Sequence, residues 1–254
     1  MTHSLTWLAD TLRGAGLKVV EQPGWQDRGR GDMGPVKGVL CHHTAGAKTG
    51  NAPSLDVILN GRPDLPGPLS QLMLARDGTF YVLAAGKCNH AGPGEWHGVT
   101  HGNSSFIGIE AENQGTGLDP WPQIQLGAYA EGVAAILKHI GADAVMAAGH
   151  KEYALPRGRK VDPSFDMVAF RQNVESIMSG RAVGSVTLAD PTRAMLRKGD
   201  MGASVKVLQT ALKITADGNF GPNTEKAVKL FQVSKGLVPD GMAGPKTWLA
   251  LGVK

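Results

Sequence analysis

Residues 36–43 read Val36-Lys37-Gly38-Val39-Leu40-Cys41-His42-His43, a mostly apolar run that lies between Pro35 and Gly46. A short apolar run bounded by turn-forming residues is typical of a buried strand. This strand would carry two histidines to one edge of a sheet. Because neighbouring side chains on a strand point to opposite faces, only one of His42 and His43 can readily face a shared site. The spacing leaves open which of the two does so.

Two other segments predict strands of the same sheet. In residues 72–83, the pair Asp77-Gly78 separates two apolar runs, which is a strong indication of a β-hairpin. In residues 106–112, side-chain alternation places Glu110 and Glu112 on one face and the isoleucines on the other. We therefore expect a strand that presents two carboxylates on one side.

Helical segments separate and follow these strands. Apolar residues recur with the 3.6-residue period of a helix in residues 5–12, 126–140 and 167–177, and a glycine follows each segment. A short helix is also expected at 54–59. Strands interleaved with helices predict an α/β or α+β domain, with a mixed central β-sheet flanked by helices.

The end of the chain predicts a small three-helix C-terminal domain. The stretch 217–224, which begins with Asp-Gly and contains Gly-Pro, is echoed 23 residues later at 240–247. Each copy is a turn followed by an apolar helical face. Residues 180–192 are small and show no periodicity, as in a linker. We therefore expect a first domain at 1–179, a linker at 180–192 and a second domain at 193–254.

Charge is unevenly shared between these parts. The chain of 254 residues has a net charge of +4, yet residues 193–254 hold ten Lys and Arg against four Asp and Glu. A basic domain of this kind suits an anionic polymer, whether nucleic acid, a membrane surface or a cell wall. The domain has no aromatic-basic RNA-reading motif and no zinc-finger spacing, which argues against nucleic acid.

The apolar content predicts no membrane insertion. No run approaches the roughly 20 consecutive apolar residues that a membrane-spanning helix needs. The first ten residues have neither the basic start nor the apolar stretch of a secretory signal. We therefore expect the protein to stay in the cytoplasm until something releases it.

Histidine and carboxylate are the expected metal ligands. The chain has only two cysteines, Cys41 and Cys88, which excludes a disulfide-dense scaffold and a four-cysteine zinc site. A catalytic zinc ion needs about three protein ligands and one open position. The set His42, His150 and Asp162 meets this need, and Asp166 could take the place of Asp162. The competing interpretation is that the histidines are ordinary core or surface residues that bind no metal.

Five motifs follow one another along the first domain: Val39–Ala45, Asn89–Gly92, Ile107–Glu110, Gly149–His150 and Gly158–Pro163. In this order they resemble the zinc N-acetylmuramoyl-L-alanine amidases of the peptidoglycan-recognition-protein and bacteriophage-lysozyme superfamily. The tail repeats, Asp-Gly-x-x-Gly-Pro-x-Thr, are similar to those of a peptidoglycan-binding domain. Both parts of the chain thus point to one polymer.

The resemblance implies a mechanism and a role for each matching residue. It implies zinc as the cofactor and hydrolysis of the amide between the lactyl group of N-acetylmuramic acid and L-alanine, by zinc-hydroxide attack. Glu110 would take up a proton and pass it to the leaving amine, and Lys160 would lie beside the oxyanion. His90 would line the substrate groove. The implied zinc ligands are His42, His150 and Asp162.

Differences among relatives favour an enzyme, because recognition proteins that only bind the wall typically lack the third ligand, which this chain offers at Asp162. Some bacteriophage members use a cysteine ligand and a tyrosine near the metal, whereas this chain has Asp162 and Glu110, as in the carboxylate-using branch. The alternatives are a non-catalytic peptidoglycan-recognition module and an amidase that recycles soluble muropeptides. We expect a monomeric bacteriophage endolysin, held in the host cytoplasm until lysis and then acting at the bacterial cell wall.

Overall fold

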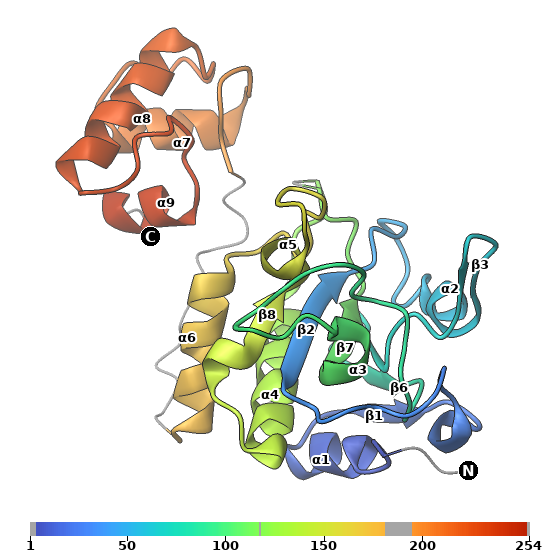
Figure 1. Ribbon diagram of the computed structural model, residues 1–254. Coiled ribbons are helices and arrows are strands. Elements are labelled where there is room, and N and C mark those ends of the chain that lie inside the picture. The colour runs from blue at the N-terminus through green and yellow to red at the C-terminus, as the bar shows by residue number, and fades with distance from the viewer. Residues whose placement is uncertain (1–3, 117, 181–194, 253–254) are drawn as a thin grey trace. The chain divides into compact units, whose positions relative to one another are not determined.

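The computed structural model describes residues 4–116, 118–180 and 195–252 (Figure 1). The chain divides into two compact units, Met1–Gly184 and Ser185–Lys254. The predicted linker lies outside the described residues except for Gly180, so its bounds stay a prediction. Among the described residues, no helix combines the length and the apolar character that crossing a membrane requires.

A six-stranded mixed sheet forms the centre of the first unit, in the order β1-β6-β5-β7-β2-β8. The β5–β6 pair is antiparallel and is the hairpin that Asp-Gly predicts, while the other neighbouring strands run parallel. The predicted mixed sheet is therefore confirmed. The strands are β1 (Val19–Glu21), β2 (Gly38–His43), β5 (Leu72–Leu74), β6 (Phe80–Val82), β7 (Phe106–Ala111) and β8 (Ala147–Gly149).

The β2–β7 pairing determines which side chains can meet at the sheet edge. The two strands run parallel over six residue pairs, from Gly38 opposite Phe106 to His43 opposite Ala111. Every residue of β2 is buried, which explains its nearly continuous apolar sequence. This register sets His42 opposite Glu110, so the histidine strand and the carboxylate strand end together.

Three helices pack together beside the sheet (Figure 1). Helix α4 (Gln123–Ile140) packs against β2, α1 (Leu8–Gly14) and α6 (Met167–Met178). Helix α4 ends at Gly141, whose φ of 67° is the left-handed conformation that favours glycine. The apolar periodicity of these helices is thus the stripe that covers the core.

The short helix expected at 54–59 is found as α2 (Leu55–Asn60). Other short elements are not predicted from the sequence, because their two to four residues show no measurable period. These elements are β3 (Gly61–Arg62), β4 (Leu65–Pro66), α3 (Gly102–Ser105), α5 (His150–Tyr153) and the 3-10 helices Trp25–Asp27 and Ala144–Met146.

The described part of the second unit contains the three predicted helices. These are α7 (Ala203–Ala211), α8 (Pro222–Ser234) and α9 (Pro245–Leu251). They enclose a separate apolar core, so this unit does not rely on the sheet for burial. The core residues are Leu196, Val205, Leu208, Phe220, Val228, Ala243 and Trp248.

A buried glutamine organises each copy of the sequence repeat. In the first copy, the Gln209 amide nitrogen donates to Asp217 Oδ1 at 2.7 Å and to Thr224 Oγ1 at 3.0 Å, while its oxygen accepts from the Gly218 N–H at 2.8 Å. In the second copy, Gln232 makes the same bonds to Asp240, Thr247 and Gly241, at 2.8, 3.1 and 3.0 Å.

These networks explain the repeated Asp-Gly and Thr positions. Asp217 and Asp240 each fix a turn, and each turn glycine has a positive φ, 80° at Gly218 and 77° at Gly241. A side-chain Cβ at Gly241 would lie 2.7 Å from the stem of Lys229. The repeat motif is therefore a structural feature that links a turn to the helix before it.

Gln232→Ala is expected to destabilise the second unit by about 1–3 kcal/mol, because buried partners would lose their hydrogen bonds. Hydrogen exchange of the full chain measures this as lost amide protection within residues 203–251. Lys226→Ala, on the exposed side of α8, serves as the control. Equal protection in the two variants would contradict a structural role for the glutamine.

The two thiols are expected to be inert in the folded protein. Cys41 and Cys88 are both free and buried, and burial raises the pKa of Cys41 to about 12 and that of Cys88 further. Since an unfolded thiol titrates near 8.5, unfolding above that pH releases protons and stability falls as pH rises. Iodoacetamide at pH 8 should label neither thiol until denaturant is added. Rapid labelling of the native chain would refute this.

Candidate metal centre

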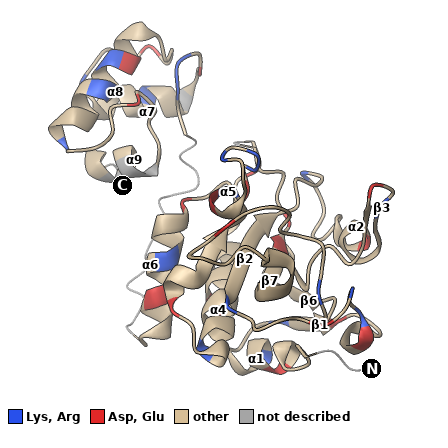
Figure 2. Cartoon of the chain, in the orientation of Figure 1, with Lys and Arg blue, Asp and Glu red and all other residues tan. Residues whose placement is uncertain are grey.

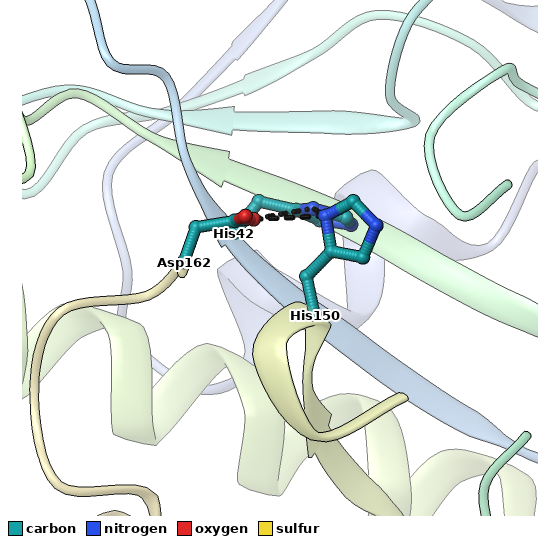
Figure 3. A group of neighbouring side chains, drawn as sticks. All are labelled: His42, His150 and Asp162. Atoms are coloured by element: carbon teal, nitrogen blue, oxygen red, sulfur yellow. Dashed lines mark hydrogen bonds and ion pairs between the residues drawn. The ribbon is translucent and has the colours of Figure 1, made fainter. Parts of the chain in front are cut away.

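The three predicted ligands come from separate elements and meet at the carboxyl end of β2 (Figure 3). His42 lies on β2, His150 is the first residue of α5, and Asp162 lies in the segment between α5 and α6. All three are buried. Asp162 Oδ2 lies 3.1 Å from His42 Nδ1 and 2.9 Å from His150 Nδ1, and the two nitrogens are 3.0 Å apart.

This donor set fits a zinc ion. Two imidazole nitrogens and one carboxylate oxygen within 4.8 Å of one another are the three protein ligands typical of a catalytic zinc site. The remaining ring nitrogens already have partners, since His150 Nε2 lies 3.0 Å from the Ala91 carbonyl oxygen and His42 Nε2 lies 3.1 Å from His90 Nδ1. A carbonyl can only accept, so the His150 proton is on Nε2 and Nδ1 is free for a cation.

The protonation states also suit a cation. Burial, together with the neighbouring His150, lowers the pKa of His42 to about 4, so this imidazole is neutral at pH 7. Burial alone would raise the pKa of Asp162, but its close contacts with His150 and His42 outweigh that effect and hold this pKa well below its usual range. The centre thus offers a neutral imidazole at His42 and an anionic oxygen at Asp162.

Glu110 lies beside the three predicted ligands. Its Oε1 is 3.8 Å from His42 Nδ1, and its side chain is 17% exposed. Among the described residues, Oε2 has no hydrogen-bond partner. Burial, with a smaller effect from the charge of Asp162, raises the pKa of Glu110 to about 8. A carboxyl group in this state can exchange a proton near neutral pH.

Glu112, the second carboxylate of the strand face, has a structural environment. It is fully buried and accepts hydrogen bonds from Thr44 Oγ1 at 2.8 Å, from the Ser54 N–H at 2.9 Å and from Ser54 Oγ at 3.0 Å. These bonds tie the segment after β2 to the start of α2. Its oxygens are therefore occupied, unlike Oε2 of Glu110.

Lys160 acts on the centre through its charge. The residue is exposed and lies two positions before Asp162. Its positive charge contributes to lowering the pKa of His42 and opposes the rise in the pKa of Glu110. Lys160 is thus close enough for its charge to influence the pKa values of His42 and Glu110.

His90 packs behind one of the ligands. It is 9% exposed, and its Nδ1 faces His42 Nε2 at 3.1 Å. Asn103 Oδ1 holds the segment by accepting from the N–H groups of His90 and Ala91, at 2.9 and 2.7 Å. His90 thus contacts His42 directly, and its contact with substrate stays a prediction.

The alternative ligands lie in other environments. His43 points away from His42 and neighbours Trp121, with ring centroids 6.4 Å apart. Asp166 caps helix α6 by accepting from the N–H groups of Val168 and Ala169, at 2.8 and 3.2 Å. These placements favour His42 over His43 and Asp162 over Asp166.

Tyr129 is a residue that sequence reasoning placed only in a helical stripe. Its hydroxyl accepts from the His42 N–H at 2.9 Å and lies 2.9 Å from the Ile109 carbonyl oxygen, so it ties α4 to both β2 and β7. A buried tyrosine needs such a partner for its hydroxyl. A polar tip within an otherwise aliphatic stripe was the available signal.

Comparison with known families gives two matches. Residues 32–165, more than half of the chain, match the family described as N-acetylmuramoyl-L-alanine amidase. Residues 201–251 match the family described as putative peptidoglycan binding domain. The first match contains all three predicted metal ligands and Glu110.

Individual relatives are similar over smaller parts. The N-acetylmuramoyl-L-alanine amidase CwlL of Bacillus licheniformis is 34% identical over 104 residues, which are 36% of this chain and 29% of that protein. The chain thus spans less than a third of this relative. A Burkholderia AP3 phage endolysin structure is 45% identical over 24% of this chain and 26% of its own, with a TM-score of 0.23. The E. coli amidase AmiD is 19% identical over 92% of this chain and 95% of its own, with a TM-score of 0.46.

Proposed function

Because the chain belongs to the N-acetylmuramoyl-L-alanine amidase family, we propose that it hydrolyses the amide between the lactyl group of N-acetylmuramic acid and L-alanine in bacterial peptidoglycan. The observation that carries this proposal is the convergence of His42, His150 and Asp162 beside Glu110. The match of residues 201–251 to a peptidoglycan-binding family supports the same substrate.

The cofactor of this reaction is proposed to be Zn²⁺, held by His42, His150 and Asp162. When bound, zinc would lower the pKa of water toward 7 and polarise the scissile carbonyl. The mixed nitrogen and oxygen donor set and the neutral state of His42 support this choice.

The proposed proton carrier is Glu110. Its carboxylate accepts a proton from the attacking water and then delivers it to the amide nitrogen as the C–N bond breaks. The products are the lactyl carboxylic acid and a stem peptide with a free L-alanine amine, so atoms and protons balance. The raised pKa of Glu110, about 8, supports both steps at neutral pH.

The other two predicted residues would act on the substrate. Lys160 carries an ammonium group whose charge reaches the centre, and it would stabilise the negative oxygen that develops on the attacked carbonyl. His90 would contact the substrate through the small part of its side chain that is exposed, since the residue is 9% exposed.

The two units would divide the work. We assign catalysis to residues 1–179, a linker to 180–192 and wall binding to 193–254. Lys and Arg residues recur along α7 and α8 and before α7 (Figure 2), which suits an anionic wall. Tethering a wall-binding unit to a catalytic unit raises the local substrate concentration. We therefore propose that the protein acts at the bacterial cell wall. We expect it to be a monomer that is held in the host cytoplasm until lysis.

Digestion of purified peptidoglycan tests this function. We expect new L-alanine amino termini without new reducing sugar ends, because an amide and not a glycosidic bond is cut. Wall binding without new amino termini would instead indicate a recognition module. Faster release from soluble muropeptides than from intact wall would indicate a recycling amidase.

A further inference from the structure

We infer that Lys151 is a positioning residue that holds Asp162 in place as a metal ligand. The inference rests on the proposed metal centre. Lys151 directly follows His150, and sequence analysis did not single it out. Its backbone N–H donates to the Asp162 carbonyl oxygen at 2.6 Å. Its ammonium group donates to the carbonyl oxygens of Pro163 and Phe165, at 2.6 and 2.7 Å.

These three bonds couple two ligands that lie 12 residues apart in the sequence. His150 begins α5, while Asp162 lies in the segment that follows this helix (Figure 3). Three carbonyl groups around Asp162 therefore bond to one residue next to His150. A ligand site needs its side chains held to within about 0.5 Å, which requires support of this kind.

The surroundings of Asp162 make this support important. Residues 155–161, which lead into Asp162, are all exposed, so packing does little to fix them. On the other side, Ser164 accepts a bond from Trp121 Nε1 at 2.9 Å, and Asp166 caps α6. Lys151 is the described residue that bonds to the main chain at Asp162 itself and at the residue after it.

A lysine suits this position because its ammonium group has three donors and no acceptor. Two of these donors bond to the carbonyl oxygens of Pro163 and Phe165. A bond from a charged donor is stronger than a neutral one. A methionine has a similar length but donates nothing, while arginine keeps both the charge and several donors.

The test measures metal binding rather than catalysis. The zinc dissociation constant of the full chain is determined by competition with a chromophoric chelator, for wild type, Lys151→Met, Lys151→Arg and Lys48→Met. Lys48 is an exposed lysine and serves as the control. The visible absorption of the Co²⁺-loaded proteins reports ligand geometry, and circular dichroism confirms that each variant is folded.

We expect Lys151→Met to weaken zinc binding by about 10- to 100-fold, as is typical when an outer partner of a ligand is lost, and to alter the Co²⁺ spectrum. Lys151→Arg should recover most of the affinity and Lys48→Met all of it. Wild-type affinity and spectrum in folded Lys151→Met would overturn the inference alone. If Lys151→Met does not fold, Lys151→Arg decides between the outcomes. A folded Lys151→Arg chain with a wild-type Co²⁺ spectrum supports the inference. A folded Lys151→Arg chain with a changed spectrum and no zinc affinity overturns it. A wild-type chain that binds no zinc overturns both this inference and the proposed cofactor.

Discussion

Glu110→Gln is expected to lower the rate of amide hydrolysis by about 100- to 10,000-fold, the usual contribution of a positioned acid or base. Glutamine has nearly the same shape but cannot accept or deliver the proton. The substitution also leaves the three predicted ligands in place, with Asp162 Oδ2 still facing the Nδ1 atoms of both histidines. Zinc content after dialysis should therefore match that of the wild-type chain. The measurement is the initial rate at which L-alanine amino termini appear from purified peptidoglycan.

Glu131→Gln is the matched control for this prediction. Glu131 lies on the exposed side of α4 and undergoes the same chemical change without contacting the centre. Its rate should equal that of wild type. A rate for Glu110→Gln within about threefold of wild type, a difference below 1 kcal/mol in the barrier, would show that this carboxylate is a structural strand residue.

Asp162→Asn is expected to remove most of the bound zinc. The variant keeps the size of the side chain but replaces the anionic oxygen that faces both histidines. Loss of an outer partner typically weakens metal binding by about 10- to 100-fold. Loss of a ligand itself should weaken zinc binding by more than this. Amide hydrolysis should fall in parallel. Zinc per chain after dialysis, measured by mass spectrometry, checks the prediction.

Asp166→Asn provides the comparison four residues along the same segment. Asp166 caps α6, and asparagine caps a helix about as well as aspartate, so this replacement should leave both stability and zinc binding nearly unchanged. The opposite pattern, with zinc lost from Asp166→Asn and kept by Asp162→Asn, would assign the ligand to Asp166. The two variants thus separate a ligand from a helix cap.

The parts of the fold that sequence predicts are those with a long or distinctive pattern. Helix α4 has 18 residues and therefore several helical turns of apolar spacing. The β5–β6 hairpin has Asp77-Gly78 in its turn, where glycine adopts a φ of 82°. Strand β8 and helix α5 have three and four residues, too few for any period to show.

The candidate site was predictable only in part, for a related reason. Alternation along β2 shows that His42 and His43 diverge, but the direction of the core decides which one faces inward. The β2–β7 register that sets Glu110 opposite His42 depends on pairing between distant segments. The bonds of Lys151 to the main chain of another segment leave no trace in local sequence, and the polar tip of Tyr129 does not reveal which main-chain groups its hydroxyl will contact.

Titration of the metal-free chain with zinc shows whether hydrolysis depends on a single metal ion. Hydrolysis of purified peptidoglycan is followed as the appearance of L-alanine amino termini at each zinc addition. We expect no hydrolysis without metal, a linear rise and a plateau at one zinc per chain, with no plateau activity for Asp162→Asn. Undiminished hydrolysis by the metal-free chain, or one bound zinc without new amino termini, would contradict this expectation.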